Sequence, residues 1–198
     1  MTTWRSDPAL QGRFHADFPD DVQVIVHDGE PRRTNKPPEA CFVRITDIVG
    51  SLRMPHAPPG AAPPVPASAL QWTERPVYRG TLLNQPHNVT SVRANHPIEF
   101  VTAPGLPHPL HITPQYAQER AQWCITPCTG CGGDQTLDPM TTMARTRFPD
   151  APGGSIPVAF SAFCPCGGTM MLAMAGGSEP PMRTTTTGAP GNPWWKFW

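Results

Sequence analysis

The stretch IPVAFSAFCPCGGTMMLAMA, residues 156–175, decides how the carboxy-terminal half of this chain folds. It places a Cys-x-Cys pair between two apolar segments, each with the length typical of a β-strand. Residues 128–133 read CTGCGG and supply a second pair, Cys-x2-Cys. Two glycines follow each pair, and glycine can take the positive φ that turns backbone N–H groups toward a thiolate. The pattern predicts two knuckles that face one another across a single metal ion.

Four thiolates held in this way form the tetrahedral sulfur site that Zn²⁺ prefers. We therefore expect a structural zinc ion, in a zinc-ribbon-like subdomain, with the ligands Cys128, Cys131, Cys164 and Cys166. A closed site of this kind leaves no coordination position for water, so it predicts no hydrolytic chemistry.

The second pair is one residue shorter than the usual Cys-x2-Cys, and this leaves alternatives open. Cys124 lies just before the first knuckle and is an alternative ligand. The spacing Cys-x3-Cys-x2-Cys also occurs in the iron–sulfur sites of radical S-adenosylmethionine enzymes. The chain after Cys131 is too short for the barrel of such enzymes, and Gly130 stands where they carry an aromatic residue. An iron–sulfur or thiol redox protein is the alternative to zinc, and free buried thiols are a third interpretation.

The amino-terminal half has the alternating apolar pattern of β-strands, with β-branched residues and turn formers between them. The segments with this pattern are 21–27 (DVQVIVH), 41–49 (CFVRITDIV), 77–83 (VYRGTLL) and 98–102. They predict a small, mostly antiparallel domain, barrel-like or an open sheet, over residues 21–112. The fold class expected for the whole chain is mainly β with little helix.

The proline content of the chain predicts a further loop and the start of a helix. The chain has 28 Pro and 17 Gly, and only 15% of its residues are charged. Residues 54–67 (MPHAPPGAAPPVPA) predict an inserted loop of polyproline character. The best helix candidate is 113–123 (TPQYAQERAQW), because Thr113 can cap it and Pro114 fits its first position.

These segments divide the chain into an arm, 1–20; the β domain, 21–112; a helix with the zinc-ribbon-like part, 113–177; and a Pro/Thr/Gly linker with an aromatic tail, 178–198. The tail ends in Trp194, Trp195, Lys196, Phe197 and Trp198. Such a cluster exposes a large apolar surface unless something covers it. It can fold back on its own core, dock on a partner chain, or lie at a membrane interface, where Trp and Lys are favoured. We expect a protein partner.

Charge and hydropathy exclude other classes of protein. The formal net charge is zero, so nucleic-acid binding has no electrostatic support. No apolar run approaches the roughly 20 residues that span a bilayer, and no secretory signal begins the sequence. We expect a cytoplasmic location in a bacterium, or one peripheral to a membrane complex. In a reducing compartment, cysteines are metal ligands or buried thiols more often than disulfides.

Eight further residues have the chemistry for a site but a simpler interpretation. His108 and His111 have a metal-binding spacing, yet their proline-rich context predicts exposed loop residues. His87 and His96 flank a turn-rich segment and are expected at the surface. For Glu119, Asp134 and Asp138 we expect a helix cap or a solvated position. Cys41 opens a predicted strand and is expected to be a small buried hydrophobe.

Residues 39–47 (EACFVRITD) and 78–100 (YRGTLLNQPHNVTSVRANHPIEF) resemble an uncharacterised family of small bacterial β domains. Its pattern is an aromatic–Val–x–Val strand, then Gly-x-Leu-x-Asn-x-Pro, then a strand ending in Phe. The resemblance covers roughly residues 39–102 and leaves out the cysteine segments. It implies an architectural role for Gly80, Asn84 and Pro86 and no established activity.

No constellation in the sequence points to catalysis. The function expected is that of a non-catalytic, zinc-stabilised binding or accessory subunit. One alternative is an iron–sulfur or thiol redox protein that uses the cysteine cluster. Another is an accessory subunit of a membrane complex, docked through the aromatic tail.

Overall fold

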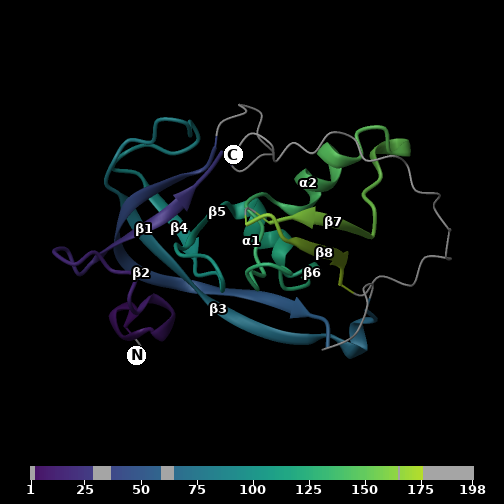
Figure 1. The fold of residues 1–198 in the computed structure, drawn as a ribbon, viewed down its shortest axis with the longest axis horizontal. Helices are drawn as coiled ribbons and strands as arrows, with labels where there is room; N and C mark the ends of the chain where they lie inside the picture. Colours follow the sequence, from purple (N-terminus) through teal and green to yellow (C-terminus); the bar gives the residue numbers. More distant parts are fainter. Residues whose placement is uncertain (1–2, 29–36, 59–64, 165, 176–198) are drawn as a thin grey trace.

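A computed structural model describes residues 3–28, 37–58, 65–164 and 166–175. The described chain is mainly β, as predicted: a closed five-stranded barrel, a separate three-stranded sheet and two α-helices (Figure 1). The barrel occupies one side of the molecule. The small sheet and both helices occupy the other (Figure 1).

The barrel is a meander in which each strand is hydrogen-bonded to the next. Its strands are β1 (Asp21–Val26), β2 (Glu39–His56), β3 (Gln71–Leu82), β4 (Pro97–Val101) and β5 (Leu110–Ile112). Sequential neighbours pair antiparallel. With an odd number of strands, the first and last run in the same direction, so the pair that closes the barrel must be parallel. The structure has this parallel pair, between Ile25 and Leu110.

The alternating apolar residues of these strands face the inside of the barrel. In β1 the residues Val22, Val24 and Val26 are fully buried, and Gln23 and Ile25 between them are half-buried. The strand predictions over 21–27, 41–49, 77–83 and 98–102 are confirmed by β1 to β4. Strand β5 was not predicted, because three residues are too few to show a period of two.

The long hairpin of β2 and β3 extends past the barrel, and here the prediction over 54–67 was partly wrong. Met54 to His56 belong to β2 and pair with β3. Pro55 is tolerated because β1 pairs with β2 only as far as Arg44, so this end of β2 has a single ladder neighbour. Residues 59–64 lie outside the described part of the chain.

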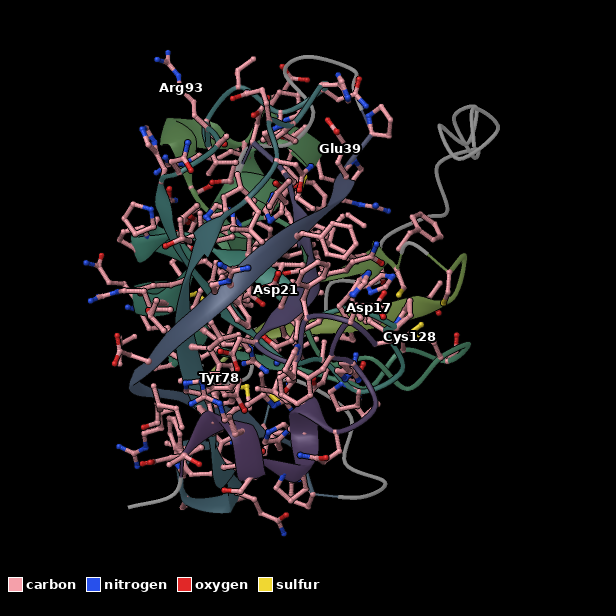
Figure 2. The ribbon with its side chains drawn as sticks, turned by 90° about the vertical axis from the view of Figure 1, so that its left-hand side faces the viewer. Asp17, Asp21, Glu39, Tyr78, Arg93 and Cys128 are labelled. Carbon is pink, nitrogen blue, oxygen red and sulfur yellow. The ribbon has the colours of Figure 1, made fainter. Side chains whose placement is uncertain are left out.

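The amino-terminal arm lies on the barrel as two short 3₁₀ turns, Trp4–Ser6 and Pro8–Leu10. Trp4 and Leu10 are buried in the barrel's hydrophobic cluster. The buried hydroxyl of Tyr78 in β3 donates to Asp7 Oδ2 at 2.6 Å. Figure 2 shows Tyr78 close to these turns. Burial, and then the Asp7 carboxylate, raise the pKa of this phenol.

The Gly-x-Leu-x-Asn-x-Pro segment is architectural. A Cβ on Gly80 would lie 2.5 Å from Val43 Cγ1 and 2.6 Å from the Arg44 carbonyl oxygen, so only glycine fits between β2 and β3. Asn84 Oδ1 accepts the backbone N–H of Phe42 at 2.7 Å. Pro86 is buried. These contacts agree with the roles that the resemblance implies, and the resemblance itself stays a prediction.

The carboxy-terminal part contains α1 (Pro114–Arg120), β6 (Trp123–Ile125), α2 (Met140–Arg147), β7 (Ala159–Phe163) and β8 (Thr169–Met174). The three strands form a sheet in the order β6, β8, β7. The predicted cap is confirmed, since Thr113 Oγ1 accepts the N–H of Tyr116 at 3.1 Å. The predicted helix is three residues too long, because Trp123 opens β6.

One hydrophobic cluster joins both halves of the chain. It contains Leu52, Met54 and Val77 of the long hairpin together with Trp123 and other residues of the carboxy-terminal part. It therefore crosses the boundary that the sequence suggested at residue 112, and the hairpin supplies part of the core behind the cysteine knuckles. None of the helices in the described ranges has the length and apolar character needed to cross a bilayer.

Candidate metal centre

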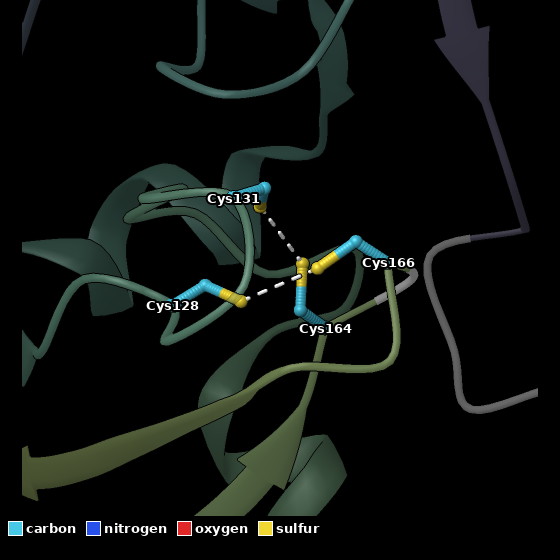
Figure 3. A group of neighbouring side chains, drawn as sticks. All are labelled: Cys128, Cys131, Cys164 and Cys166. Atoms are coloured by element: carbon cyan, nitrogen blue, oxygen red, sulfur yellow. Dashed lines mark hydrogen bonds between the residues drawn. The ribbon is translucent and has the colours of Figure 1, made fainter.

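Four cysteine sulfurs converge beside the small sheet (Figure 3). Their Sγ atoms all lie within 4.8 Å of one another. Cys128 Sγ is 3.4 Å from Cys166 Sγ, and Cys131 Sγ is 3.5 Å from Cys164 Sγ. A zinc ion with tetrahedral Zn–S bonds of about 2.3 Å places its sulfurs about 3.8 Å apart. The four cysteines thus have the spacing of ligands to one metal ion and can hold one.

Each knuckle is a tight turn closed by two backbone hydrogen bonds. In the first, Cys128 N donates to the Gly133 carbonyl at 2.8 Å, and Gly132 N donates to the Cys128 carbonyl at 2.9 Å. In the second, Cys164 N donates to the Gly168 carbonyl at 2.8 Å, and Gly167 N donates to the Cys164 carbonyl at 2.9 Å. The shorter Cys-x-Cys pair therefore forms an equivalent turn and still brings both sulfurs to the group.

Backbone N–H groups point at two of the sulfurs, and one of these groups belongs to Gly168, a glycine that follows the second Cys pair as predicted. Gly130 N lies 3.4 Å from Cys128 Sγ, and Gly168 N lies 3.4 Å from Cys166 Sγ. Burial raises the pKa of the Cys128 thiol, but the N–H groups of Cys131 and Gly130 outweigh it and lower this pKa to about 7. Burial raises the pKa of Cys131 and of Cys164. Four thiolates this close repel one another, so a cation is needed to ionise them together.

The two knuckles leave no room for a side chain between them. A Cβ on Gly168 would lie 2.5 Å from Cys128 Sγ and 2.6 Å from Gly130 N. We expect Gly168→Ala to displace Cys128 and to weaken metal binding by about 10- to 100-fold, the usual effect of disturbing groups around a metal ligand. Competition with a chromophoric chelator measures this change. Gly50→Ala is the matched control, because nothing lies within 4 Å of its Cβ position; equal losses in both variants would contradict the prediction.

The first knuckle also packs against the barrel. Gly105, in the loop between β4 and β5, has a φ of 73°, and its Cβ position lies 1.9 Å from the Cys131 carbonyl oxygen. A Cβ on Gly133 would likewise lie 3.2 Å from the Pro104 carbonyl oxygen. The barrel loop and the knuckle therefore touch backbone to backbone, and the position of Cys131 depends on both.

A buried charged network lies next to the first knuckle, and the solvated position expected for Asp134 was wrong. Asp134 is 7% exposed and receives both N–H groups of Arg75, each at 2.9 Å. Burial raises the pKa of Asp134, but the hydrogen bonds and charge of Arg75 outweigh it and lower the pKa. Because Arg75 belongs to β3, this ion pair ties the long hairpin to the segment after the knuckle.

Arg120 is completely buried at the end of α1. It donates to the Trp123 carbonyl at 2.6 Å, to Gln135 Oε1 at 3.2 Å and to the Asp134 carbonyl at 3.3 Å. Tyr116 also donates to Gln135 Oε1, at 2.7 Å. Arg120 was not among the residues predicted to matter, although an Arg close in sequence to Trp123 and the cysteines is a signal of a buried anchor.

The remaining candidates lie apart from the four sulfurs. Cys124 is buried in β6 and is not in the group; burial raises its pKa. Cys41 is buried in the barrel, as predicted. Glu119 does cap a helix, because its Oε2 accepts the N–H of Thr141 in the first turn of α2 at 2.9 Å. Asp138 Oδ1 lies 3.5 Å from Nδ1 of His27.

The histidines divide into two groups. His87 and His96 are exposed, as predicted, and His108 is half-buried. For His111 the prediction of an exposed loop residue was wrong, because β5 carries it to the interior, where it is 8% exposed. Within the described residues its Nδ1 has no hydrogen-bond partner, and its ring lies 5.9 Å from that of His27.

This burial makes stability depend on pH. Burial, and then the charge of His27, lower the pKa of His111 to about 4, whereas an unfolded histidine titrates near 6.5. Between these values the unfolded chain binds a proton that the folded chain does not. Stability is therefore complete above about pH 6.5 and falls by up to about 3 kcal/mol as the pH drops to 4.

We expect His111→Phe to flatten this part of the pH profile, measured as the free energy of unfolding in denaturant. His96→Gln, at an exposed site, should keep the slope of the natural chain. Both variants keep all the cysteines, so the difference between their free energies of unfolding at each pH does not contain the acid sensitivity of the cysteines. An unchanged slope in His111→Phe would show that another group carries the effect.

Comparison of the chain with protein-family models, with curated proteins and with solved structures gave no match. The aromatic residues predicted to bind a partner, Trp194, Trp195, Phe197 and Trp198, lie outside the described residues. Any functional conclusion must therefore come from the cysteine group and its surroundings.

Proposed function

We propose that the protein is a non-catalytic binding or accessory subunit whose carboxy-terminal part is stabilised by one structural zinc ion. The observation that carries the proposal is the group of four cysteine sulfurs within 4.8 Å of one another. Four thiolates fill a tetrahedral coordination sphere, so a bound ion has no open position for a water or a substrate. The ion would then hold the two knuckles together.

The donor set alone suits both zinc and iron, since soft thiolates bind Zn²⁺ and iron–sulfur clusters alike. The spacing favours one ion. In a cluster at least some of the thiolates bind different iron atoms, and those sulfurs stand farther apart than ligands that share an ion. Here all four Sγ atoms lie within 4.8 Å of one another. A mononuclear site therefore explains the geometry better than a cluster.

The test is the metal content and the visible spectrum of the purified protein. One zinc per chain in a colourless protein supports the proposal. A brown protein that contains iron overturns it and favours the iron–sulfur alternative. A protein without metal, whose four cysteines exchange between thiol and disulfide, favours the thiol redox alternative.

The accessory role needs a partner, and the aromatic tail is the proposed contact. We propose a protein partner, in a bacterial cytoplasm, with a membrane complex as the alternative. A full-length variant with Ser at Trp194, Trp195, Phe197 and Trp198 tests this contact. Loss of co-purifying protein supports a protein partner. Loss of membrane association, with co-purification unchanged, favours the alternative.

A further inference from the structure

A shallow hollow of about 430 Å³ lies between the end of α2 and the start of β7. Its volume is within the range of roughly 300–1,000 Å³ typical of ligand sites. Its apolar wall includes Phe148, Pro149, Ile156 and Pro157, and charged side chains at its edge are Arg147 and Asp150. Figure 1 shows the segment between α2 and β7 at the outer side of the small sheet.

The wall of this hollow is an exposed aromatic surface on a rigid base. Phe148 is 39% exposed, and its ring packs edge-on against Phe160 at 6.2 Å. Phe160 packs edge-on against Trp123, 5.6 Å away in the core. Aromatic rings prefer these edge-to-face contacts, so the three rings hold Phe148 in place. The hollow thus offers a fixed apolar wall to a second aromatic group.

The chain leaves the small sheet beside this wall. Met174, the last residue of β8, donates its N–H to the Val158 carbonyl at 2.8 Å. Val158 follows directly after Pro157 of the wall. The described chain ends at Ala175, so the segment that leads to Trp194 starts next to the hollow. A chain of n residues can span up to about 3.3–3.6 Å × n when extended, so the length of sequence between Ala175 and Trp194 is sufficient for the tail to reach the hollow.

The side chains of the tail are complementary to those that line the hollow. Trp194 to Trp198 offer four aromatic rings and Lys196. An indole ring packs well on an apolar wall and accepts a cation such as Arg147 over its face. The positive charge of Lys196 matches the negative charge of Asp150. Within the described ranges, Asp150 forms no ion pair. A hollow of this size holds one or two such rings.

We propose that the segment Trp194–Trp198 docks in this hollow of its own chain. The short tether makes the docking intramolecular, with an effective concentration on the order of 1 mM. A contact with a dissociation constant of about 100 μM is then about 90% formed. The hollow would hold the tail until a partner competes for it, which adds a regulation to the proposed accessory role and rests on the tail contact of that proposal.

Hydrogen exchange of residues 147–157 in the full-length protein tests the docking. We compare the natural chain with the full-length variant in which the four tail aromatics are Ser. Exchange in the natural chain is expected to be about ten-fold slower, because the tail leaves the hollow open in only about one tenth of the molecules. A synthetic peptide of residues 192–198 should bind the variant and bind the natural chain at least about ten-fold more weakly.

Charge reversal makes the test specific. Asp150→Lys should speed exchange and weaken the contact, and the double variant Asp150→Lys with Lys196→Asp should restore it. Equal exchange in the natural chain and the Ser variant overturns the proposal. Protection that grows with protein concentration also overturns it, because the tail then docks on a second copy. If the purified protein contains no zinc and residues 147–157 are still protected by the tail, the proposed zinc role is overturned and this inference stands.

Discussion

Cys128→Ser is expected to release the metal ion and to unfold the carboxy-terminal part of the protein. Binding of a structural zinc ion contributes on the order of 10 kcal/mol of apparent folding free energy, which is as large as the total stability of a typical domain. Cys128 is the best-placed ligand for this test, because it is buried and contacts Cys166 and the N–H of Gly130. Metal analysis measures the first effect, and hydrogen exchange of β6, whose Trp123 is 1% exposed, measures the second.

The matched control is Cys124→Ala, a buried cysteine of the same segment that lies outside the group of four. It should keep one metal ion per chain and slow hydrogen exchange in β6, at a cost of a few kcal/mol at most. Chelation of the natural chain should reproduce Cys128→Ser. The ligand assignment would be wrong if Cys124→Ala released the ion and Cys128→Ser retained it.

Arg120→Ala is expected to lower the free energy of unfolding by about 3–5 kcal/mol, the usual effect of breaking a buried charged network. The substitution leaves the Trp123 and Asp134 carbonyls without their buried donor, and Gln135 Oε1 with the Tyr116 hydroxyl alone. Denaturant unfolding of the metal-loaded protein measures the change.

Arg79→Ala is the control for this second prediction. Arg79 also forms an ion pair, at 2.7 Å with Glu99, but the two side chains are 48% and 39% exposed. An exposed pair contributes about 0–1 kcal/mol because water screens it. Similar losses in the two variants would show that the Arg120 network is not the anchor that its burial suggests.

Local patterns predicted the barrel strands and the four cysteines that the structure brings together. The Val-rich alternation of β1 and the two Cys–Gly knuckles each carry their signal in a few consecutive residues. The Cys-x-Cys pair was the doubtful part of the site. It works because the turn from Cys164 to Gly168 is closed by backbone hydrogen bonds, which do not depend on the residue between the two cysteines.

The missed features depend on contacts between distant segments. The sequence around His111 is short and rich in proline, and only the pairing of β5 with β1 and β4 makes it a strand. Asp134 was predicted at the surface because Arg75, which neutralises it, is far away in the sequence, in strand β3. The helix α2 was missed because few of its residues are apolar, so it has no marked periodicity.

The contact of Gly105 with Cys131 has a consequence for the order of folding. The loop that carries Gly105 lies between the last two barrel strands, and β5 must find β1 across most of the amino-terminal half. Pairing of such distant segments is slow, because a long loop must close first. The first knuckle reaches its final position only when that loop is in place. Capture of the metal ion is then a late event, and its rate should follow closure of the barrel rather than diffusion of the ion.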